Sequence, residues 1–149
     1  MYSEVSDDIL NFILGGKAEF SIIQDATSTS KKVIMRYEIS KSIDNPKIYF
    51  VSTECNTSRI VKYHGYLLRT RDGIKFKRGN AKISDEDFNI RSIKGLMWVI
   101  KVLELRGCIP GSVHVIHHGR CSRCGRKLKD EESLRYGLGP ECRKKIGFR

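Results

Sequence analysis

The sequence of 149 residues contains no apolar run close to the roughly 20 residues that cross a bilayer. Its start, MYSEVSDDIL, has neither a basic segment nor a long apolar one, so we expect no signal peptide. Only five cysteines are present, and an odd number argues against a disulfide framework. We therefore expect a cytoplasmic protein with no membrane partner, whose clustered cysteines bind metal more readily than each other.

Motifs typical of common enzyme classes are also missing. The sequence has no glycine-rich phosphate loop, no nucleophile elbow and no HExxH. Asp85, Glu86 and Asp87 form an acidic cluster, but their place at a predicted helix start explains them. His64 and His114 lie in strand-like runs, where histidines are more often structural than catalytic. We therefore predict that the protein is not an enzyme.

Acidic residues are too few to balance the basic ones. Lys and Arg number 28 against 17 Asp and Glu, which gives a formal net charge of +11 and a pI near 9.6. Residues 59–82 hold eight basic residues and one acidic, and residues 117–149 hold ten basic and four acidic. A surface this positive attracts polyanions, of which nucleic acid is the commonest, although an acidic protein would satisfy the same charge.

The first half of the chain is patterned as an antiparallel sheet. Five runs rich in β-branched and aromatic residues alternate with turn-like segments such as ATSTSK and SIDNP. Arg71-Asp72-Gly73 between the last two runs predicts a tight hairpin. Strands in series predict a β-meander, either a curved sheet or a small barrel. The runs are AEFSIIQD (18–25), KVIMRYEIS (32–40), KIYFVSTE (47–54), RIVKYHGYLLRT (59–70) and IKFKRG (74–79).

One amphipathic helix follows the predicted strands. Ser84 before three acidic residues predicts its start, while Gly107 and Pro110 predict its end, so we expect a helix over about 85–106. Its apolar residues recur at i, i+3, i+4 and i+7, a spacing that places them on the face that packs against the sheet. They are Ile93, Leu96, Met97, Ile100 and Leu103.

We therefore assign the chain to the α+β class with two parts. Residues 1–112 are predicted to form a β-rich domain that includes the long helix. Residues 113–149 are predicted to form a small C-terminal metal module, which SVHVIHHG (112–119) enters as one more short strand.

The segment HHGRCSRCGRKLKDEESLRYGLGPEC carries the clearest chemical signal. Cys121 and Cys124 form a CxxC pair, whose spacing lets two thiolates hold one ion, and Cys142 follows with 17 residues between. A tetrahedral site needs a fourth ligand, and His117 and His118 stand just before the pair. Three thiolates and one imidazole favour Zn²⁺ over magnesium or calcium, so we predict one zinc ion.

The cysteines allow two other interpretations. They could be reduced thiols without metal, but a third cysteine and adjacent histidines argue against this. A thioredoxin-type CxxC usually heads a helix, whereas this one leads into the polar turn GRKLKD. We expect a structural zinc, because enough protein ligands are available to close the site and a module this small cannot bury a sufficient core.

The order of elements in this segment resembles a treble-clef zinc module. Pro140 suits the first position of a helix that carries Cys142 in its opening turn. The pattern also resembles a zinc-binding domain of unknown function found in phage and bacterial proteins, over about the last 33 residues. The matching residues are His117, Gly119, Arg120, Cys121, Cys124, Gly125, Arg126, Leu128, Ser133, Gly137, Gly139, Pro140, Cys142 and Lys145.

The resemblance carries expectations of its own. It implies His117 as the fourth ligand, because the histidine of the pattern stands four residues before its first cysteine. It implies an accessory metal-binding module, sometimes attached to DNA-processing enzymes, and supplies no activity. The first part of the chain also looks like the companion domain of such phage proteins, through GGKAEFSI, IYFVST and YHGYLL.

The basic residues are candidates for contacts to nucleic acid, because Lys and Arg neutralise phosphates. Tyr63, Tyr66 and Phe76 alternate with them, and exposed rings would stack on unpaired bases. Strand aromatics are usually packing residues, however, and we expect these three to face the core. The predicted contact residues are Lys62, Arg69, Arg71, Lys75, Lys77, Arg78, Arg120, Arg123, Arg126, Lys127, Arg143, Lys144 and Lys145.

Together these features predict a zinc-containing accessory or regulatory protein that binds DNA or RNA, encoded by a phage or mobile element and acting in the host cytoplasm. Phosphate contacts would dominate, so we expect weak sequence specificity. The alternative is a protein-interaction factor that binds and modulates an acidic host protein, such as an enzyme or a defence component.

Overall fold

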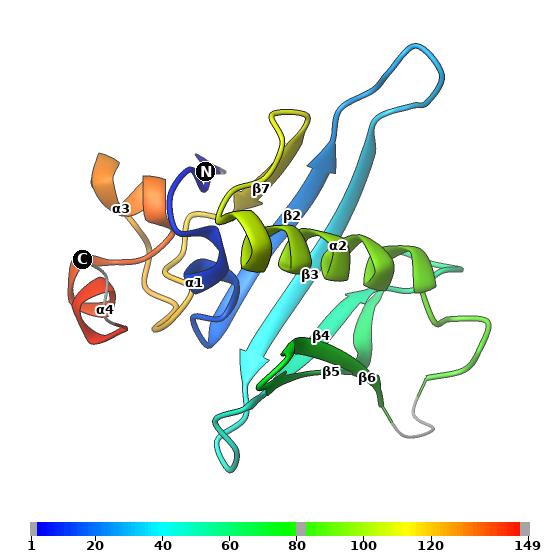
Figure 1. Cartoon of the computed structure of the whole chain (residues 1–149), viewed down its shortest axis with the longest axis horizontal. Coiled ribbons are helices and arrows are strands. Elements are labelled where there is room, and N and C mark those ends of the chain that lie inside the picture. The colour runs from blue at the N-terminus through cyan, green and yellow to red at the C-terminus, as the bar shows by residue number, and fades with distance from the viewer. Residues whose placement is uncertain (1–2, 80–82, 147–149) are drawn as a thin grey trace.

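The computed structural model describes residues 3–79 and 83–146, and these contain one open antiparallel sheet in the order β1-β7-β2-β3-β4-β5-β6 (Figure 1). The α+β class is confirmed, and the sheet is not closed into a barrel. The strands are β1 (Ser3–Glu4), β2 (Lys17–Gln24), β3 (Val33–Lys41), β4 (Ile48–Glu54), β5 (Val61–Thr70), β6 (Gly73–Arg78) and β7 (Val113–His117). The helices are α1 (Ile9–Ile13), α2 (Ile90–Arg106), α3 (Glu131–Tyr136) and α4 (Pro140–Lys145).

Strands β2 to β6 form the predicted meander. Each pairs with the next, and the two residues Arg71 and Asp72 connect β5 to β6 as the sequence predicted. The chain then crosses the sheet through α2 and returns as β7 beside β2. β1 adds the outer edge by pairing with β7. The two ends of the described chain therefore meet at one side of the sheet.

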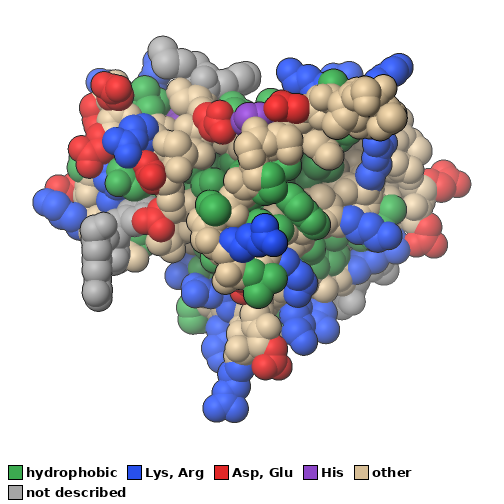
Figure 2. Space-filling model, turned by 45° about the horizontal axis from the view of Figure 1, so that its top comes forward, with side chains coloured by type: hydrophobic (Ala, Val, Ile, Leu, Met, Phe, Trp, Pro, Cys, Tyr) green, Lys and Arg blue, Asp and Glu red, His purple; other side chains and the backbone are tan. Residues whose placement is uncertain are grey.

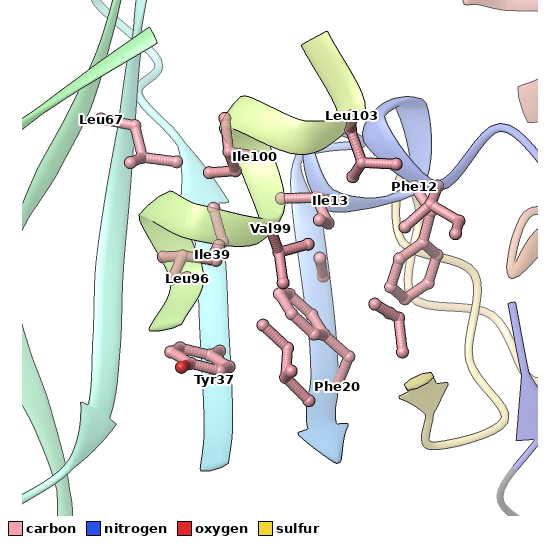
Figure 3. Close-up of a cluster of buried hydrophobic side chains, with 14 of the residues drawn as sticks. Phe12, Ile13, Phe20, Tyr37, Ile39, Leu67, Leu96, Val99, Ile100 and Leu103 are labelled. Atoms are coloured by element: carbon pink, nitrogen blue, oxygen red, sulfur yellow. The ribbon is translucent and has the colours of Figure 1, made fainter. Parts of the chain in front are cut away.

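The main core lies between α2 and one face of the sheet (Figure 3). Phe20, Tyr37, Ile39 and Leu67 point from the strands toward Leu96, Val99, Ile100 and Leu103 of α2. The predicted apolar stripe of the helix thus faces the sheet, and only Met97 of that stripe is partly buried. The Tyr37 hydroxyl donates to the Ser92 carbonyl at 2.6 Å, so even the polar atom in this layer is paired.

Helix α2 begins later than the sequence predicted. Ser84 does not cap it; its carbonyl accepts from the Phe88 amide within a separate turn. Asn89 is the N-cap, and its side-chain oxygen accepts from the Ser92 amide at 3.1 Å. The helix ends at Gly107 as predicted, with φ of 76°.

The sequence did not predict β1 and α1. The two-residue strand is too short to show a period, and the five-residue α1 has no side-chain cap. Both lie next to the C-terminal segment in space (Figure 1). The predicted ranges 1–112 and 113–149 also include residues 1–2, 80–82 and 147–149, which lie outside the described residues.

Candidate metal centre

The CxxC pair sits in a short hairpin. The Leu128 amide donates to the Gly119 carbonyl and the Cys121 amide to the Arg126 carbonyl, both at 2.8 Å. The chain reverses at Gly125, which has φ of 81° and donates to the Cys121 carbonyl at 2.9 Å. This tight reversal brings the two thiols to the same side of the turn.

Two short helices bring the third cysteine to the hairpin. Asp130 caps α3, where its carboxylate accepts from the Ser133 amide at 3.0 Å. Pro140 occupies the start of α4 and Cys142 lies in its first turn, as the sequence predicted. The predicted order of a hairpin with two cysteines, a connecting segment and a helix that carries the third cysteine is therefore present.

The thiols of Cys121, Cys124 and Cys142 lie within 4.8 Å of one another. In a tetrahedral site with Zn–S bonds of about 2.3 Å, two sulfurs are about 3.8 Å apart, so small side-chain adjustments bring the three onto one ion. Cys121 and Cys142 are buried and Cys124 is exposed. These three residues can hold a metal ion of the kind that thiolates prefer.

The surroundings of the thiols favour one thiolate and oppose a second. Burial raises the pKa of Cys121, but backbone N–H groups of Cys124, Gly139 and Arg123 outweigh this and lower it. Burial and the neighbouring sulfurs raise the pKa of Cys142, although the Arg123 guanidinium, 3.7 Å from its sulfur, opposes that shift. A bound cation would remove the repulsion between the thiolates.

The structure does not bring His117 into the group of thiols. Neither His117 nor His118 belongs to a metal-binding group among the described residues. The buried His117 ring accepts from the Gly119 amide at Nδ1 and donates from Nε2 to the Leu134 carbonyl, both at 2.8 Å. To bind zinc, this ring would give up one of the two hydrogen bonds. His117 as fourth ligand therefore stays a prediction that this arrangement does not support.

A pocket of about 630 Å³ opens onto the three thiols. Its walls carry several basic side chains together with the carboxylates of Asp130 and Glu141. The two carboxylates line the same pocket as the thiols, although neither belongs to the group of ligand atoms among the described residues. The basic side chains of the pocket are Arg123, Arg126, Lys127, Lys129 and Lys145.

We call residues 118–146 the cysteine module and the other described residues the sheet body. The two are joined through the N-terminal segment: the Lys17 amide donates to the Ser122 carbonyl at 2.5 Å, and the Ser6 amide to the Arg135 carbonyl at 3.0 Å. Arg135 also forms an ion pair with Asp7 at 2.6 Å. β7, at the start of the predicted module, is instead part of the main sheet, because Val113 and Val115 belong to its core.

The predicted phosphate-binding residues differ in their surroundings. Lys62 pairs with Asp87 at 3.4 Å and Arg78 with Asp85 at 2.8 Å. Arg143 donates to the Leu138 carbonyl at 2.7 Å and lies over the Tyr136 ring, so it joins α3 to α4. The remaining predicted contact residues form no ion pair with any residue in the ranges 3–79 and 83–146. They are Arg69, Arg71, Lys75, Lys77, Arg120, Arg123, Arg126, Lys127, Lys144 and Lys145.

The expectation that all three hairpin aromatics face the core is wrong for the tyrosines. Phe76 packs against the core, but Tyr63 and Tyr66 are half-buried on the opposite face. A β-bulge is responsible: Val51 pairs with Gly65 and Ser52 with Tyr63, so the ladder skips His64. Tyr63 and Tyr66 are three residues apart, yet they point to the same face of the sheet.

His64 is turned to the other side of the same bulge. Its Nδ1 donates to the Lys62 carbonyl at 2.8 Å, and its Nε2 accepts from the Asn89 amide at 3.1 Å. Burial lowers the pKa of His64, which keeps the ring neutral and suited to this pair of hydrogen bonds. The histidine is therefore structural, as expected, and it fixes the start of α2 to the bulge.

Comparison with protein families gives one match. Residues 114–147 match a family of unknown function, DUF6011. The match covers the whole cysteine module and β7 except Val113, which is the region of the resemblance described above, and its description assigns neither an activity nor a metal. No curated protein and no solved structure matches the chain significantly. None of the helices in the described residues is long and apolar enough to cross a membrane.

Proposed function

We propose that the chain is a zinc-containing accessory protein, encoded by a phage or mobile element, that binds nucleic acid through basic side chains held in place by the cysteine module. The observation that carries this proposal is the grouping of Cys121, Cys124 and Cys142 beside a pocket with basic walls. The zinc is structural: it cross-links the hairpin to α4 and thereby orders the side chains on both.

Zinc fits this donor set better than the metals that prefer oxygen. Soft thiolates select zinc over magnesium and calcium, and the Gly139 amide lies 3.4 Å from the Cys121 sulfur, where it stabilises negative charge. Elemental analysis of the purified chain should find one zinc per molecule. Cys142→Ser should lower that content strongly, whereas Cys55→Ser, which changes a buried thiol outside the group, should leave it unchanged.

The fourth ligand can be assigned with four single variants. We expect His117→Ala and His118→Ala each to retain one zinc per chain, because neither ring lies in the thiol group. Asp130→Asn and Glu141→Gln test the two carboxylates that line the pocket. Stoichiometric loss of zinc in His117→Ala, in a chain that otherwise remains folded, would restore the ligand set predicted from the sequence.

Charge supports the nucleic-acid part of the proposal. The net charge is +11, and Arg126, Lys127 and Lys145 line the pocket without an ion pair to any described residue. Clusters of one sign repel each other, and binding a polyanion relieves that repulsion. Contacts of this kind reach phosphates and carry little sequence information.

Fluorescence anisotropy tests binding directly. The zinc-loaded chain is titrated into labelled single-stranded DNA, duplex DNA and RNA at about 50 and about 200 mM salt. A footprint of about five phosphates predicts a slope of log K against log salt of about −4.5 on duplex and about −3.5 on a single strand. Lys127→Gln with Arg126→Gln should weaken binding, while Lys31→Gln with Lys32→Gln, the same loss of charge in a loop of the sheet body, should weaken it less.

A protein partner is the second candidate, and an exposed apolar surface on α2 favours it. Trp98 is 48% exposed and Leu105 is 85% exposed, and a groove of about 260 Å³ lies beside Trp98. Figure 2 shows hydrophobic side chains gathered in the middle of the displayed face. Absence of nucleic-acid binding at low salt by a zinc-loaded chain, with capture of a host protein that Trp98→Ala loses, would favour this function instead.

A further inference from the structure

The face of the sheet opposite α2 is uncovered in the described part of the chain. Every outward-pointing side chain of β2 to β5 is half-buried or exposed, whereas the core residues of these strands, such as Phe20, Tyr37 and Val51, all point inward. α2 lies on the other side of the sheet, and α1, α3 and α4 lie at the end near β1 (Figure 1). We call this surface the open face.

Three aromatic rings gather on the open face. Phe50 of β4 pairs directly with Tyr66 of β5, and the bulge brings Tyr63 onto the same side. The Phe50 and Tyr63 rings meet edge to face with centroids 6.0 Å apart. Phe50 is 38% exposed, although burying an aromatic side chain stabilises a fold. Tyr63 and Tyr66 are half-buried, so part of each of the three rings reaches solvent on this side.

The bulge that creates this cluster is firmly held. A Cβ on Gly65 would collide with the Lys77 carbonyl and with the Phe76 ring, so the backbones of β5 and β6 approach closely here. The Tyr63 ring lies over Gly79, where a side chain would displace it. On the side of the sheet that faces α2, the hydrogen bonds of His64 to Lys62 and Asn89 hold the bulge in place. The rings are thus mounted on a rigid part of the fold and need no rearrangement to bind.

Positive charge borders the aromatic cluster on one side. Lys77 pairs with Tyr66 and Lys75 with Leu68, so both exposed lysines share the open face with the rings. Neither forms an ion pair with a described residue. The acidic side chains of this face, Glu19, Glu38 and Glu54, lie on β2, β3 and the end of β4. Lys17 and Arg36 alternate with these carboxylates on β2 and β3, so charge of both signs is mixed there. The described charges of the open face on β5 and β6 are positive, and a bound polyanion would therefore run along these two strands.

We propose that the open face binds single-stranded nucleic acid, with bases stacked on Phe50, Tyr63 and Tyr66 and phosphates on Lys75 and Lys77. Rings provide a surface for any unpaired base, and lysines beside them neutralise the backbone, a combination suited to a single strand. In a duplex the bases are already stacked on each other and do not present their faces. This inference rests on the proposed function and deepens it, because it adds base stacking on the sheet body to the phosphate contacts of the cysteine module and names the form of nucleic acid.

The test compares aromatic variants on the two sides of the sheet. Phe50→Leu and Tyr66→Leu remove a π-face while keeping an apolar side chain, and Trp98→Leu is the matched change on α2. We expect each open-face variant to weaken binding of a labelled single strand by about 5-fold to 150-fold with little change in salt slope, and Trp98→Leu to leave it unchanged. Lys75→Gln with Lys77→Gln should weaken binding and reduce the salt slope by about 1.4. Circular dichroism and zinc content establish that each variant is folded.

A second measurement locates the strand without relying on variants. A single strand carrying 5-iodouracil is irradiated with the zinc-loaded chain, and the cross-linked peptide is identified by mass spectrometry. Cross-links to residues 48–54 or 61–70 support the inference.

The possible failures are distinguishable. Binding of the native chain that all open-face variants retain, with cross-links in the cysteine module, would overturn the inference and leave the proposed function standing. A preference for duplex DNA would do the same. No binding of any nucleic acid at low salt would remove both. A dimer that forms with rising concentration and is lost in Phe50→Leu would instead assign the open face to a second copy of the chain.

Discussion

The sheet body and the cysteine module reach a fixed structure by different means. The core of the sheet body contains buried apolar side chains from six strands and two helices. The hydrophobic cluster of the cysteine module has four buried members, Cys121, Leu128, Leu138 and Cys142, and two of these are thiols. Apolar burial stabilises the first region by about 25 cal/mol per Å² removed from water, whereas the second has too little such surface.

The difference gives the proposed zinc ion a structural role. Ordering a small polar segment costs conformational entropy, and the burial of apolar surface offsets little of that cost. A cross-link therefore has to supply the remaining stability. Contacts with Phe12 and the N-terminal segment supply part of that stability, since Gly137 of the module lies against the Phe12 ring of α1 and α3 lies against β1. The effect of a substitution on stability and on zinc content should therefore depend on the region in which it lies.

Loss of one metal ligand should have the largest effect, and it should be local. Structural zinc contributes about 10–16 kcal/mol in zinc-finger peptides, so Cys121→Ser should release the metal and unfold residues 119–146. Hydrogen exchange followed by mass spectrometry should show lost protection there and retained protection in α2. Cys108→Ser, at an exposed cysteine outside the group, is the control. A Cys121→Ser chain with full protection in the module would contradict the role given to zinc.

Truncation of a core side chain should destabilise the sheet body and leave the metal site intact. Leu96 is fully buried between α2 and the sheet, and Leu96→Ala should lower the free energy of unfolding by about 2–5 kcal/mol. Zinc content should stay at one per chain, because the thiols lie outside this core. Leu105→Ala removes the same atoms from the same helix at an 85% exposed site and should change stability by about 0.5 kcal/mol or less. Urea denaturation followed by circular dichroism measures both.

The parts of the fold that the sequence predicted are those with a strong local signal. The meander follows from five runs of strand-forming residues, and the start of α4 from Pro140 before Cys142. α2 was misplaced at its start because Ser84 and the acidic residues after it form a separate turn, and Asn89 makes the cap. Capping signals in sequence do not say which of two successive candidates the tertiary contacts select.

The parts that were missed depend on contacts between distant residues. A spacing of three normally places two strand residues on opposite faces, and only the skipped residue His64 brings Tyr63 and Tyr66 together. The glycine after a histidine in the run YHGY was the only available signal of a bulge. In the same way, the hydrogen bonds of His117 to Gly119 and Leu134 could not be read from its distance to Cys121 along the chain.

The contact between the two regions can be tested at a single glycine. Gly137 ends α3 with φ of 68°, and an added Cβ would collide with the ring of Phe12 in α1. Gly107 ends α2 with φ of 76°, and apart from its chain neighbours no described residue has an atom within 4 Å of the position of such a Cβ. Both alanine variants should lose about 1–2 kcal/mol through the left-handed conformation, and Gly137→Ala should lose about 1–3 kcal/mol more by overpacking. Equal losses in thermal unfolding would mean that the module does not rest on α1 in solution.

The smallest effect is expected at the edge where β1 meets β7. His114 lies between two carboxylates, with Nδ1 3.0 Å from Glu4 and Nε2 3.1 Å from Asp25, and its hydrogen bonds to them raise its pKa. A raised folded-state pKa means that the folded chain binds more protons, so this stabilisation is complete below about pH 6.5 and is lost as pH rises through the folded value. The carboxylates are half exposed, which keeps the contribution small. Thermal unfolding of the native chain should therefore lose more stability between about pH 6 and 8 than that of His114→Gln. The other histidines, His64, His117 and His118, have lowered pKa values and are present in both chains. The difference between the two pH profiles therefore isolates the contribution of His114. Parallel profiles would show that His114 does not hold β1 in place.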